Sequence, residues 1–418
     1  MSRTAATPRR VVVTGIGAIT PIGHGAAGLW AGVLRNVSAV RAIDRFDASP
    51  FPSRIAAQID DFVPADHLDA RRARRLDRFS QLAVAAARGA AESSRLPLAD
   101  ERSERTGIFI GSALGGVAYG EEQHAAYVRR GIRGVSPTLA LAVFGGAGAS
   151  NVAIDLGITG PAVGNANSCA SGAMAIGQAF HAIRDGSLDA ALAGGAEAPL
   201  APLTFGAFAM IRVLSQRNDD PVAASRPFDL ARDGFVMAEG AAILALEERS
   251  GAERRGAPII AEVLGFGAST DAYHMTAPRP DGRDAARAVR LALADAGLEA
   301  GAVGYVNAHA SGTTLNEPAE ARALHRALGP RARDVPVSGT KGLHGHALGA
   351  SGAIEAAITS LALADGLLPG TCNLDHPDRS LELNLLTAAC RQRVQVALST
   401  SFGFGGLNAA LLLGRYSG

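Results

Sequence analysis

Short apolar runs alternate with amphipathic stretches along most of the chain. Val11–Val13 predicts a buried strand that enters a glycine turn at Thr14–Gly17, and the spacing over Phe79–Ala91 predicts a helix. The run Thr106–Ile110 predicts a second buried strand, which leads into the glycine-rich stretch Gly111–Gly116. Further strands are expected at Ala190–Gly194, Ala241–Glu247, Val303–Asn307 and Ala409–Leu413. Strands and helices that alternate in this way predict a layered α/β architecture.

The glycines after the first strand do not complete a dinucleotide-binding fingerprint. Such a fingerprint needs a third glycine near Thr20, followed by the opening turn of a helix. Pro21 and Ile22 do not suit that helix, so the pattern gives no support to a nucleotide site.

An internal repeat indicates two related halves. The sequence Ala-Ser-Gly-Ala at 170–173 recurs at 350–353, and each copy is followed by Asp-Gly at the same distance. Chance is one explanation in a chain so rich in alanine and glycine. Duplication is favoured because each copy follows a loop that carries reactive side chains. No low-complexity linker separates the halves, 1–257 and 258–418, so they should form one compact unit with neighbouring helix starts.

Composition and charge narrow the functional classes. With 418 residues, 48% of them hydrophobic, the chain can bury a large core. The formal net charge of +1 creates no global field that would attract nucleic acid or a membrane surface. Aromatic residues make up only 5% of the chain, which leaves little surface on which bases could stack.

Cysteine usage and the amino terminus predict a cytoplasmic location. Cys169, Cys372 and Cys390 are odd in number and widely spaced, which argues against a disulfide framework and for a reducing compartment. The segment Met1–Arg10 is basic, but no apolar stretch with a cleavage site follows it. No uncharged apolar run approaches the roughly 20 residues of a membrane span.

Cys169 is the first candidate for chemistry. It precedes a predicted helix, where exposed backbone N–H groups would favour the nucleophilic thiolate. The small residues that follow it, 170–173, would let a reacting group approach the backbone closely. The alternative is an inert buried cysteine, which is the more common case for an isolated thiol.

Two downstream loops carry further polar candidates. His309 lies where the strand Val303–Asn307 ends, and Lys341, His344 and His346 lie together in a glycine-rich loop. A metal site is an alternative interpretation of the two histidines of that loop. No nearby cysteine or carboxylate completes a zinc spacing, and Lys341 would repel a cation, so no metal is expected.

Two other features complete the candidate site. Glu355, one helical turn after Ser351, could pair with Lys341 or could be a solvated helix charge. The glycine loop Ser399–Gly406 offers backbone N–H groups suited to an oxyanion hole, with Phe404 as a movable wall. Its structural alternative is a turn before the last strand.

Taken together, these residues resemble the chain-elongating β-ketoacyl-[acyl-carrier-protein] synthases of the thiolase superfamily, particularly the KAS II type. The resemblance runs from Val11–Gly15 through Arg226–Asp229 and Arg232–Phe235 to the terminal glycine loop, and includes Asp271–Thr276. It implies the thiolase fold, with five αβαβα layers and two pseudo-symmetric halves.

The resemblance also implies an activity and a set of roles. The activity is decarboxylative Claisen condensation of malonyl-[acyl-carrier-protein] with an enzyme-bound acyl thioester, in fatty-acid synthesis. Cys169 would accept the acyl group, and its backbone amide and that of Phe404 would form the oxyanion hole. His309 and His346 would bind the malonyl thioester carbonyl and assist decarboxylation. Lys341, paired with Glu355, would organise the site.

The same resemblance implies a substrate channel and partners. Ser311 and Thr313 would contact the phosphopantetheine arm, and Leu114 and Phe208 would line the acyl pocket. No cofactor is expected beyond that arm, which arrives on the acyl-carrier protein. A homodimer is expected, and a heterodimer with a chain-length factor is the alternative.

Several positions depart from the usual family pattern. Ala310-Ser311-Gly312-Thr313 replaces Gly-Thr-Ser-Thr, Ala238 replaces a glycine and Leu407 replaces a threonine. A dedicated polyketide or polyene ketosynthase is therefore an alternative pathway assignment. A degradative thiolase would carry a second cysteine in the terminal loop, a chain-length factor would lack Cys169, and a cysteine hydrolase would not explain Lys341.

A basic run between residues 71 and 78 is the candidate docking surface for the carrier protein. Arg71 and Arg75 are four residues apart and could share one face of a helix. Arg212 matches another docking position of the resembling family. The alternative is a solvated helix face, which is what most charge runs are.

Overall fold

The computed structural model describes residues 8–98 and 101–418, and the amino-terminal segment Met1–Thr7 lies outside them. In these residues, one mixed sheet of 12 strands has the order β13-β11-β10-β15-β16-β9-β1-β8-β7-β5-β6, and β2 pairs with β1. Its strands are β1 (Val11–Thr20), β2 (Gly23–His24), β5 (Thr106–Gly111), β6 (Ala162–Asn165), β7 (Ala190–Glu197), β8 (Gly240–Glu248), β9 (Ala261–Thr270), β10 (Tyr305–Asn307), β11 (Pro336–Ser338), β13 (Asn384–Leu385), β15 (Val396–Gly403) and β16 (Leu407–Arg415).

Fourteen α-helices, in the described part of the chain, surround and separate the two halves of this sheet. They are α1 (Gly25–Arg35), α2 (Ala70–Ala73), α3 (Arg78–Ser94), α4 (Glu101–Glu104), α5 (Val117–Arg130), α6 (Leu139–Ala142), α7 (Ala147–Leu156), α8 (Ser171–Arg184), α9 (Pro202–Met210), α10 (Arg249–Arg254), α11 (Arg283–Ala296), α12 (Asn316–Leu328), α13 (Lys341–His344) and α14 (Ser351–Asp365). Two small strand pairs lie outside the sheet, β3 (Val40–Ala42) with β4 (Ile55–Ala57) and β12 (Leu367–Leu368) with β14 (Cys390–Arg391).

The two halves of the sheet have the same topology. One half runs β1-β8-β7-β5-β6 and the other β9-β16-β15-β10-β11, with antiparallel and parallel pairings in the same sequence. A short antiparallel pairing of Val11–Val13 with Ala261–Val263 joins them. The matching order supports duplication as the origin of the repeated Ala-Ser-Gly-Ala segments.

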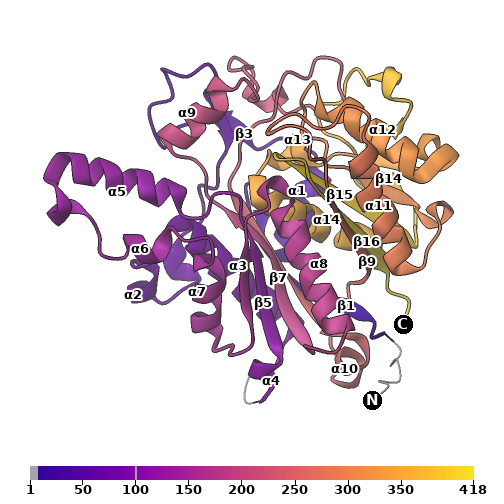
Figure 1. The fold of residues 1–418 in the computed structure, drawn as a ribbon, viewed down its shortest axis with the longest axis horizontal. Coiled ribbons are helices and arrows are strands. Elements are labelled where there is room, and N and C mark those ends of the chain that lie inside the picture. The colour runs from indigo at the N-terminus through magenta and orange to yellow at the C-terminus, as the bar shows by residue number, and fades with distance from the viewer. Residues whose placement is uncertain (1–7, 99–100) are drawn as a thin grey trace.

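Five layers result from the way in which the helices cover the two half-sheets. Helices α3 and α7 cover the first half-sheet, α8 and α14 lie between the halves, and α11 and α12 cover the second (Figure 1). Most side chains of α8 and α14 are buried, because both helices contact strands on both sides. This architecture confirms the predicted five-layered thiolase fold.

One predicted turn is wrong. The chain does not turn at Thr14–Gly17 but continues as β1 to Thr20. Gly15 and Gly17 are needed for packing, since an added Cβ at Gly15 would lie 2.4 Å from Ala90 O, and one at Gly17 would lie 1.8 Å from Ala86 O. The glycines therefore allow α3 to press against the strand.

The other predicted elements are present with small changes in length. The helix over Phe79–Ala91 is α3, and the strands predicted at Thr106–Ile110 and Ala241–Glu247 are β5 and β8. The terminal loop is shorter than predicted, because Ser399–Gly403 belongs to β15. No helix among the described residues is long and apolar enough to cross a membrane.

Candidate active site

Cys169 lies in a 3₁₀ turn, Ser168–Ala170, directly before α8. Ser168 has a φ of 53°, a left-handed conformation that a serine adopts only when the surroundings enforce it. Ser171 stabilises the turn, since its hydroxyl donates to the Ser168 carbonyl at 2.6 Å. The end of β15 presses against the other side, because an added Cβ at Gly403 would lie 3.0 Å from Cys169 N. The thiol is thus held in a fixed position at the helix start.

The acidity of the Cys169 thiol differs from the sequence-based expectation. Burial raises its pKa to about 11, although the Ser168 hydroxyl, the charge of Lys341 and the Phe404 backbone N–H all act to lower it. The favourable field at the helix start is therefore outweighed by desolvation of the thiolate in the closed site. The resting thiol is neutral at pH 7, and its proton must leave as the sulfur attacks.

Two backbone N–H groups border the reacting sulfur. One belongs to Cys169 itself, and the other belongs to Phe404, which donates toward the sulfur. The close approach of Gly403 to Cys169 brings them together. Preorganised N–H groups beside a nucleophile can stabilise the oxyanion of an acyl-transfer intermediate.

His309 and His346 lie side by side next to Cys169. Their ring centroids are 5.3 Å apart in an edge-to-face arrangement, and both rings line the same cavity as Cys169. Burial, together with the positive charge of Lys341, holds the pKa of each imidazole well below its usual range. Both histidines are therefore neutral at pH 7, and each can offer one ring N–H to a negatively charged oxygen.

Different groups orient the two rings. The hydroxyl of Ser351, the first residue of α14, lies 2.7 Å from Nδ1 of His346. The His309 backbone N–H donates to Glu320 at 2.8 Å, and its carbonyl accepts from the Lys341 ammonium. The ring of His346 is thus supported from α14, whereas the backbone of His309 is supported from α12 and α13.

Lys341 and Glu355 form a fully buried ion pair. The Lys341 ammonium donates to Glu355, and it lies 3.4 Å from Nδ1 of His309. Burial raises the pKa of Glu355 to about 7, against the opposing charge of Lys341. Lys341 is not part of the cavity wall. It influences the site through its positive charge, which helps to lower the pKa of His309 and His346. The predicted Lys341–Glu355 pairing is present, and the solvated-charge alternative for Glu355 is wrong.

A cavity of about 280 Å³ joins the candidate residues. It is lined by Cys169, His309, His346 and Phe404 and also by the predicted channel and docking residues Leu114, Phe208, Ser311, Thr313 and Arg212. The rings of Phe208 and Phe404 stack with their centroids 6.2 Å apart. A mostly apolar wall with a few converging polar groups is typical of a small-molecule site.

The basic run does not form the shared helical face that the sequence predicts for Arg71 and Arg75. Helix α2 ends at Ala73, so Arg75 lies outside it and does not share a helical face with Arg71. Both side chains are exposed, and neither lines the cavity. Arg72 pairs instead with the buried Asp155, and Arg78 pairs with a buried glutamate. Within the run, these two arginines have structural partners.

Two buried carboxylates next to the site, Glu197 and Glu320, were not predicted from the sequence. Glu197 accepts bonds from the backbone N–H groups of Ala113 and Leu114, in the cavity wall, and from Gly349 in the other half. Glu320 accepts the backbone N–H groups of His309 and Ala310. A carboxylate in an apolar stretch was the available signal for Glu197, since a buried charge needs several partners.

In the described part of the chain, His344 and His346 are not joined by a third residue that could complete a metal site. His344 is buried, its Nε2 lies 3.2 Å from the Thr340 hydroxyl, and desolvation lowers its pKa to about 3. Among the described residues there is no group of three or more histidine, cysteine or acidic side chains that could hold a metal ion.

Comparison with known proteins identifies the family. The model for the beta-ketoacyl synthase N-terminal domain matches residues 8–252, and that for the C-terminal domain matches residues 260–375. The chain belongs to the β-ketoacyl synthase family. It is therefore an acyltransferase-class enzyme.

Relatives of similar length support this family membership. The chain is 43% identical to 3-oxoacyl-[acyl-carrier-protein] synthase 2 of Synechocystis sp., over 98% of each chain. It is 41% identical to the synthase of the same name from Coxiella burnetii, over 97% of this chain and 99% of that one.

Solved structures of β-ketoacyl synthases share the fold. A type II PKS acyl-carrier protein in complex with its ketosynthase bound to the hexaketide superposes with a TM-score of 0.90 at 32% identity. The ishigamide ketosynthase/chain length factor superposes with a TM-score of 0.90 at 34% identity. Each match covers 98% of this chain and all of the other.

Proposed function

We propose that the protein catalyses the decarboxylative condensation of malonyl-[acyl-carrier-protein] with an acyl group bound to Cys169, in fatty-acid synthesis. The observation that carries the proposal is the convergence of a buried thiol, two neutral imidazoles and two backbone N–H groups on one cavity. The relatives named 3-oxoacyl-[acyl-carrier-protein] synthase 2 support this assignment.

The first half-reaction loads the acyl primer. The Cys169 sulfur attacks the primer thioester, the thiol proton passes to the departing pantetheine thiolate, and an acyl-enzyme remains. The backbone N–H groups of Cys169 and Phe404 stabilise the oxyanion of the tetrahedral intermediate.

The second half-reaction forms the carbon–carbon bond. Malonyl thioester loses carbon dioxide, and the electron pair of the broken bond enters an enolate whose oxygen accepts N–H bonds from His309 and His346. The enolate carbon attacks the acyl thioester and the C–S bond breaks. The sulfur of Cys169 leaves as a thiolate, which takes up a proton from the solvent. Burial, assisted by the positive charge of Lys341, lowers the pKa of both imidazoles and keeps them neutral, which preserves them as N–H donors.

In this proposal the enzyme needs no metal and no redox cofactor of its own. The phosphopantetheine arm enters with the carrier protein and passes Ser311 and Thr313, whose hydroxyls are 3.0 Å apart in the cavity wall. Leu114 and Phe208 line the part of the cavity that receives the acyl chain.

The test is direct. The purified protein is incubated with malonyl-[acyl-carrier-protein] and a ladder of acyl-carrier proteins, and the products are read by intact mass. Extension of a primer by two carbons with loss of carbon dioxide supports the proposal. Primer loading without extension in every case would overturn it.

A dedicated polyketide ketosynthase is the second candidate. The altered segment Ala310–Thr313 favours it, because its residues Ser311 and Thr313 line the cavity that the pantetheine arm would use. The type II PKS ketosynthase and the ishigamide ketosynthase/chain length factor support the same alternative. Repeated extension without reduction of the β-keto groups, dependent on a second subunit, would distinguish this function from fatty-acid synthesis.

We further propose that the partners are an acyl-carrier protein and a second subunit, a homodimer first and a heterodimer with a chain-length factor as the alternative, in the cytoplasm. Arg212 is exposed at the cavity and is the leading docking residue, ahead of Arg71 and Arg75. We expect Arg212→Glu to raise the KM for the carrier protein several-fold at low salt, because rim charges govern encounter.

The control for this docking prediction is Arg75→Glu, which should have the smaller effect. Alkylation of Cys169 by a small reagent should be unchanged in both variants, and the KM difference should shrink at high salt. Equal KM values for wild type and Arg212→Glu at low salt would contradict a docking role for Arg212.

A further inference from the structure

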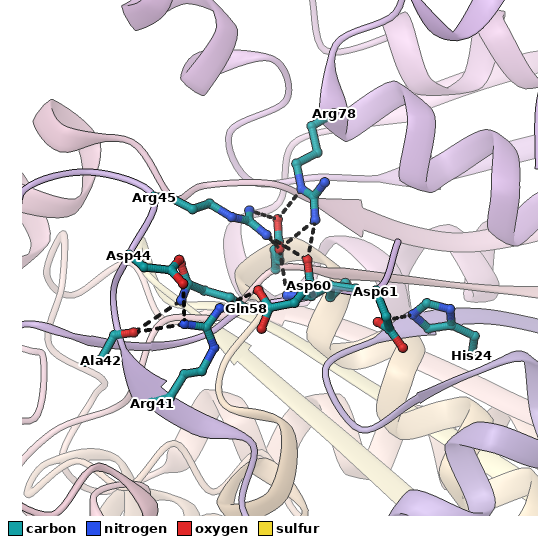
Figure 2. A network of polar contacts seen from close by, with 11 residues as sticks. His24, Arg41, Ala42, Asp44, Arg45, Gln58, Asp60, Asp61 and Arg78 are labelled. Carbon is teal, nitrogen blue, oxygen red and sulfur yellow. Dashed lines mark hydrogen bonds and ion pairs between the residues drawn. The ribbon is translucent and has the colours of Figure 1, made fainter. Parts of the chain in front are cut away.

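A buried carboxylate between two arginines lies behind one of the two catalytic histidines. Glu239 is fully buried and accepts bonds from Arg45, from Arg78 and from the backbone N–H of Ile59, the last at 2.8 Å. Both guanidinium groups also donate to the Ile59 carbonyl, at 2.9 and 2.8 Å. Figure 2 shows Arg45 and Arg78 converging from two directions on the same acceptors. We call the trio Arg45, Glu239 and Arg78 the clamp.

The clamp holds the end of an extended segment that contacts His346 directly. The backbone N–H of Ala238 donates to the His346 carbonyl at 3.0 Å, and the backbone N–H of His346 donates to the Val236 carbonyl at 2.7 Å. The segment is held on its other side by Ala57, whose N–H donates to the Met237 carbonyl at 2.9 Å. The backbone of His346 is thus the outer member of a small three-stranded arrangement.

The segment held by the clamp packs closely against His346 and the residue before it, Gly345. Gly345 has a φ of 69°, and an added Cβ there would lie 3.0 Å from the Cβ of Ala238 and 3.1 Å from that of Ala57. The ring of Phe235, at the start of the segment, packs edge-on against His346 with centroids 5.1 Å apart. In such close packing, a displacement of Ala238 must be passed on to His346.

The buried charge of Glu239 is balanced by the two arginines of the clamp. Burial acts to raise the pKa of Glu239, but Arg78 and Arg45 together bring it below its usual value, so the carboxylate is charged at pH 7. Removal of one arginine leaves a buried charge with a single counterion, and the segment is expected to shift toward a new partner. His309 has no such connection, since its backbone is held by Glu320 and Lys341.

We propose that the clamp is a positioning device for His346, which fixes the imidazole where the enolate oxygen of the malonyl half-reaction develops. The role in catalysis rests on the proposed function, whereas the mechanical coupling to His346 does not. The segment is hydrogen-bonded to the backbone of His346, whereas it meets Cys169 only through apolar packing of Phe235 and Met237. The turn of Cys169 is held by α8 and β15, so the clamp should affect decarboxylation much more than primer loading.

The experiment compares Arg45→Ala with Arg41→Ala. Arg41 belongs to the same arginine-rich network (Figure 2) but pairs with the surface carboxylates Asp44 and Asp60 and makes no bond to Glu239. Release of carbon dioxide from malonyl-carrier protein and transfer of the primer to Cys169 are measured separately. We expect Arg45→Ala to slow decarboxylation about 10- to 100-fold, with primer loading within about twofold of wild type.

Two further variants test the mechanism. Arg45→Lys keeps one charged donor and should recover most of the lost decarboxylation, whereas Glu239→Gln should reproduce the Arg45→Ala defect. A parallel fall of both half-reactions in Arg45→Ala, or equal behaviour of Arg45→Ala and Arg41→Ala, would overturn the proposal.

Amide hydrogen exchange tests the coupling without any activity. We expect the backbone amides of Ala238 and His346 to exchange faster in Arg45→Ala than in wild type and to be unchanged in Arg41→Ala. Unchanged exchange at both amides would overturn the clamp. If the wild-type protein fails to decarboxylate malonyl thioester, the proposed function fails, while the exchange result still decides the mechanical part.

Discussion

Two helix starts in the middle of the molecule share a backbone design and differ in chemistry. The turn Ser168–Ala170 precedes α8 and the turn Leu348–Ala350 precedes α14. The first residue of each turn has a positive φ, 53° at Ser168 and 39° at Leu348. The central position is Cys169 in one turn and Gly349 in the other, which makes Gly349 the counterpart of the nucleophile.

The difference follows from what each turn faces. Cys169 opens toward the cavity, whereas Gly349 is pressed into the other half, where an added Cβ would lie 2.3 Å from Ala113 N and 2.7 Å from Glu197 Oε2. One copy of the duplicated turn therefore presents a reactive side chain, and the other closes the contact between the halves.

Among the changes that test this comparison, loss of the nucleophile should have the largest effect on activity. We expect Cys169→Ala to reduce acyl transfer and condensation at least about 1,000-fold, since no other thiol lines the cavity. Radiolabelled primer transfer measures the loss, and peptide mass spectrometry of the wild type should place the acyl group on Cys169. Cys372→Ala is the matched control, and an acyl group on Cys372 or Cys390 would refute the assignment.

The second half of the molecule is tested by His346→Ala. We expect carbon dioxide release to fall about 10²- to 10³-fold, because one N–H donor to the enolate oxygen is lost, with primer loading changed only a few-fold. Ser351→Ala should give a smaller defect of the same kind, since Ser351 contacts Nδ1 of His346. A collapse of loading with normal decarboxylation would mean that the roles of the two halves are reversed.

Substitution of Gly349, in the second turn, should destabilise the fold. We expect Gly349→Ala to lower the free energy of unfolding by about 1–3 kcal/mol, because the new methyl group would overlap the Ala113 backbone. Chemical denaturation measures the change. Gly301→Ala is the control, as its Cβ would meet no atom within 4 Å, and equal effects of the two substitutions would show that the close packing at Gly349 is not what matters.

The last prediction concerns how the rate of alkylation of Cys169 depends on pH. Because burial raises the pKa of this thiol to about 11, the neutral form dominates at pH 8, and the thiolate fraction grows as the pH rises toward that value. The rate of alkylation by iodoacetamide should therefore still be increasing at pH 10, by roughly tenfold per pH unit. A plateau below pH 8 would indicate that the helix start, and not burial, controls the acidity.

The sequence by itself determined the kind of architecture and the identity of the reactive side chains. Apolar runs predicted six strands of the sheet, β1, β5, β7, β8, β10 and β16, because local hydrophobic patterning decides which segments can be buried. The repeated Ala-Ser-Gly-Ala segments indicated duplication, and the matching strand order of the two halves supports that origin. Cys169, His309, Lys341 and His346 were recognisable from their types and loop contexts.

Only the tertiary structure decided the pKa of Cys169 and the partners of the charged side chains. The acidity of Cys169 depends on how much of its surroundings exclude water, which no local pattern encodes. The run after residue 70 resembles one basic face, but helix α2 ends early and Asp155 captures one of its arginines. Glu239 contacts residues 161 to 194 positions away, and such pairings exist only once the chain is folded. Sequence fixes which groups are present, and long-range packing fixes their charge, their partners and their orientation.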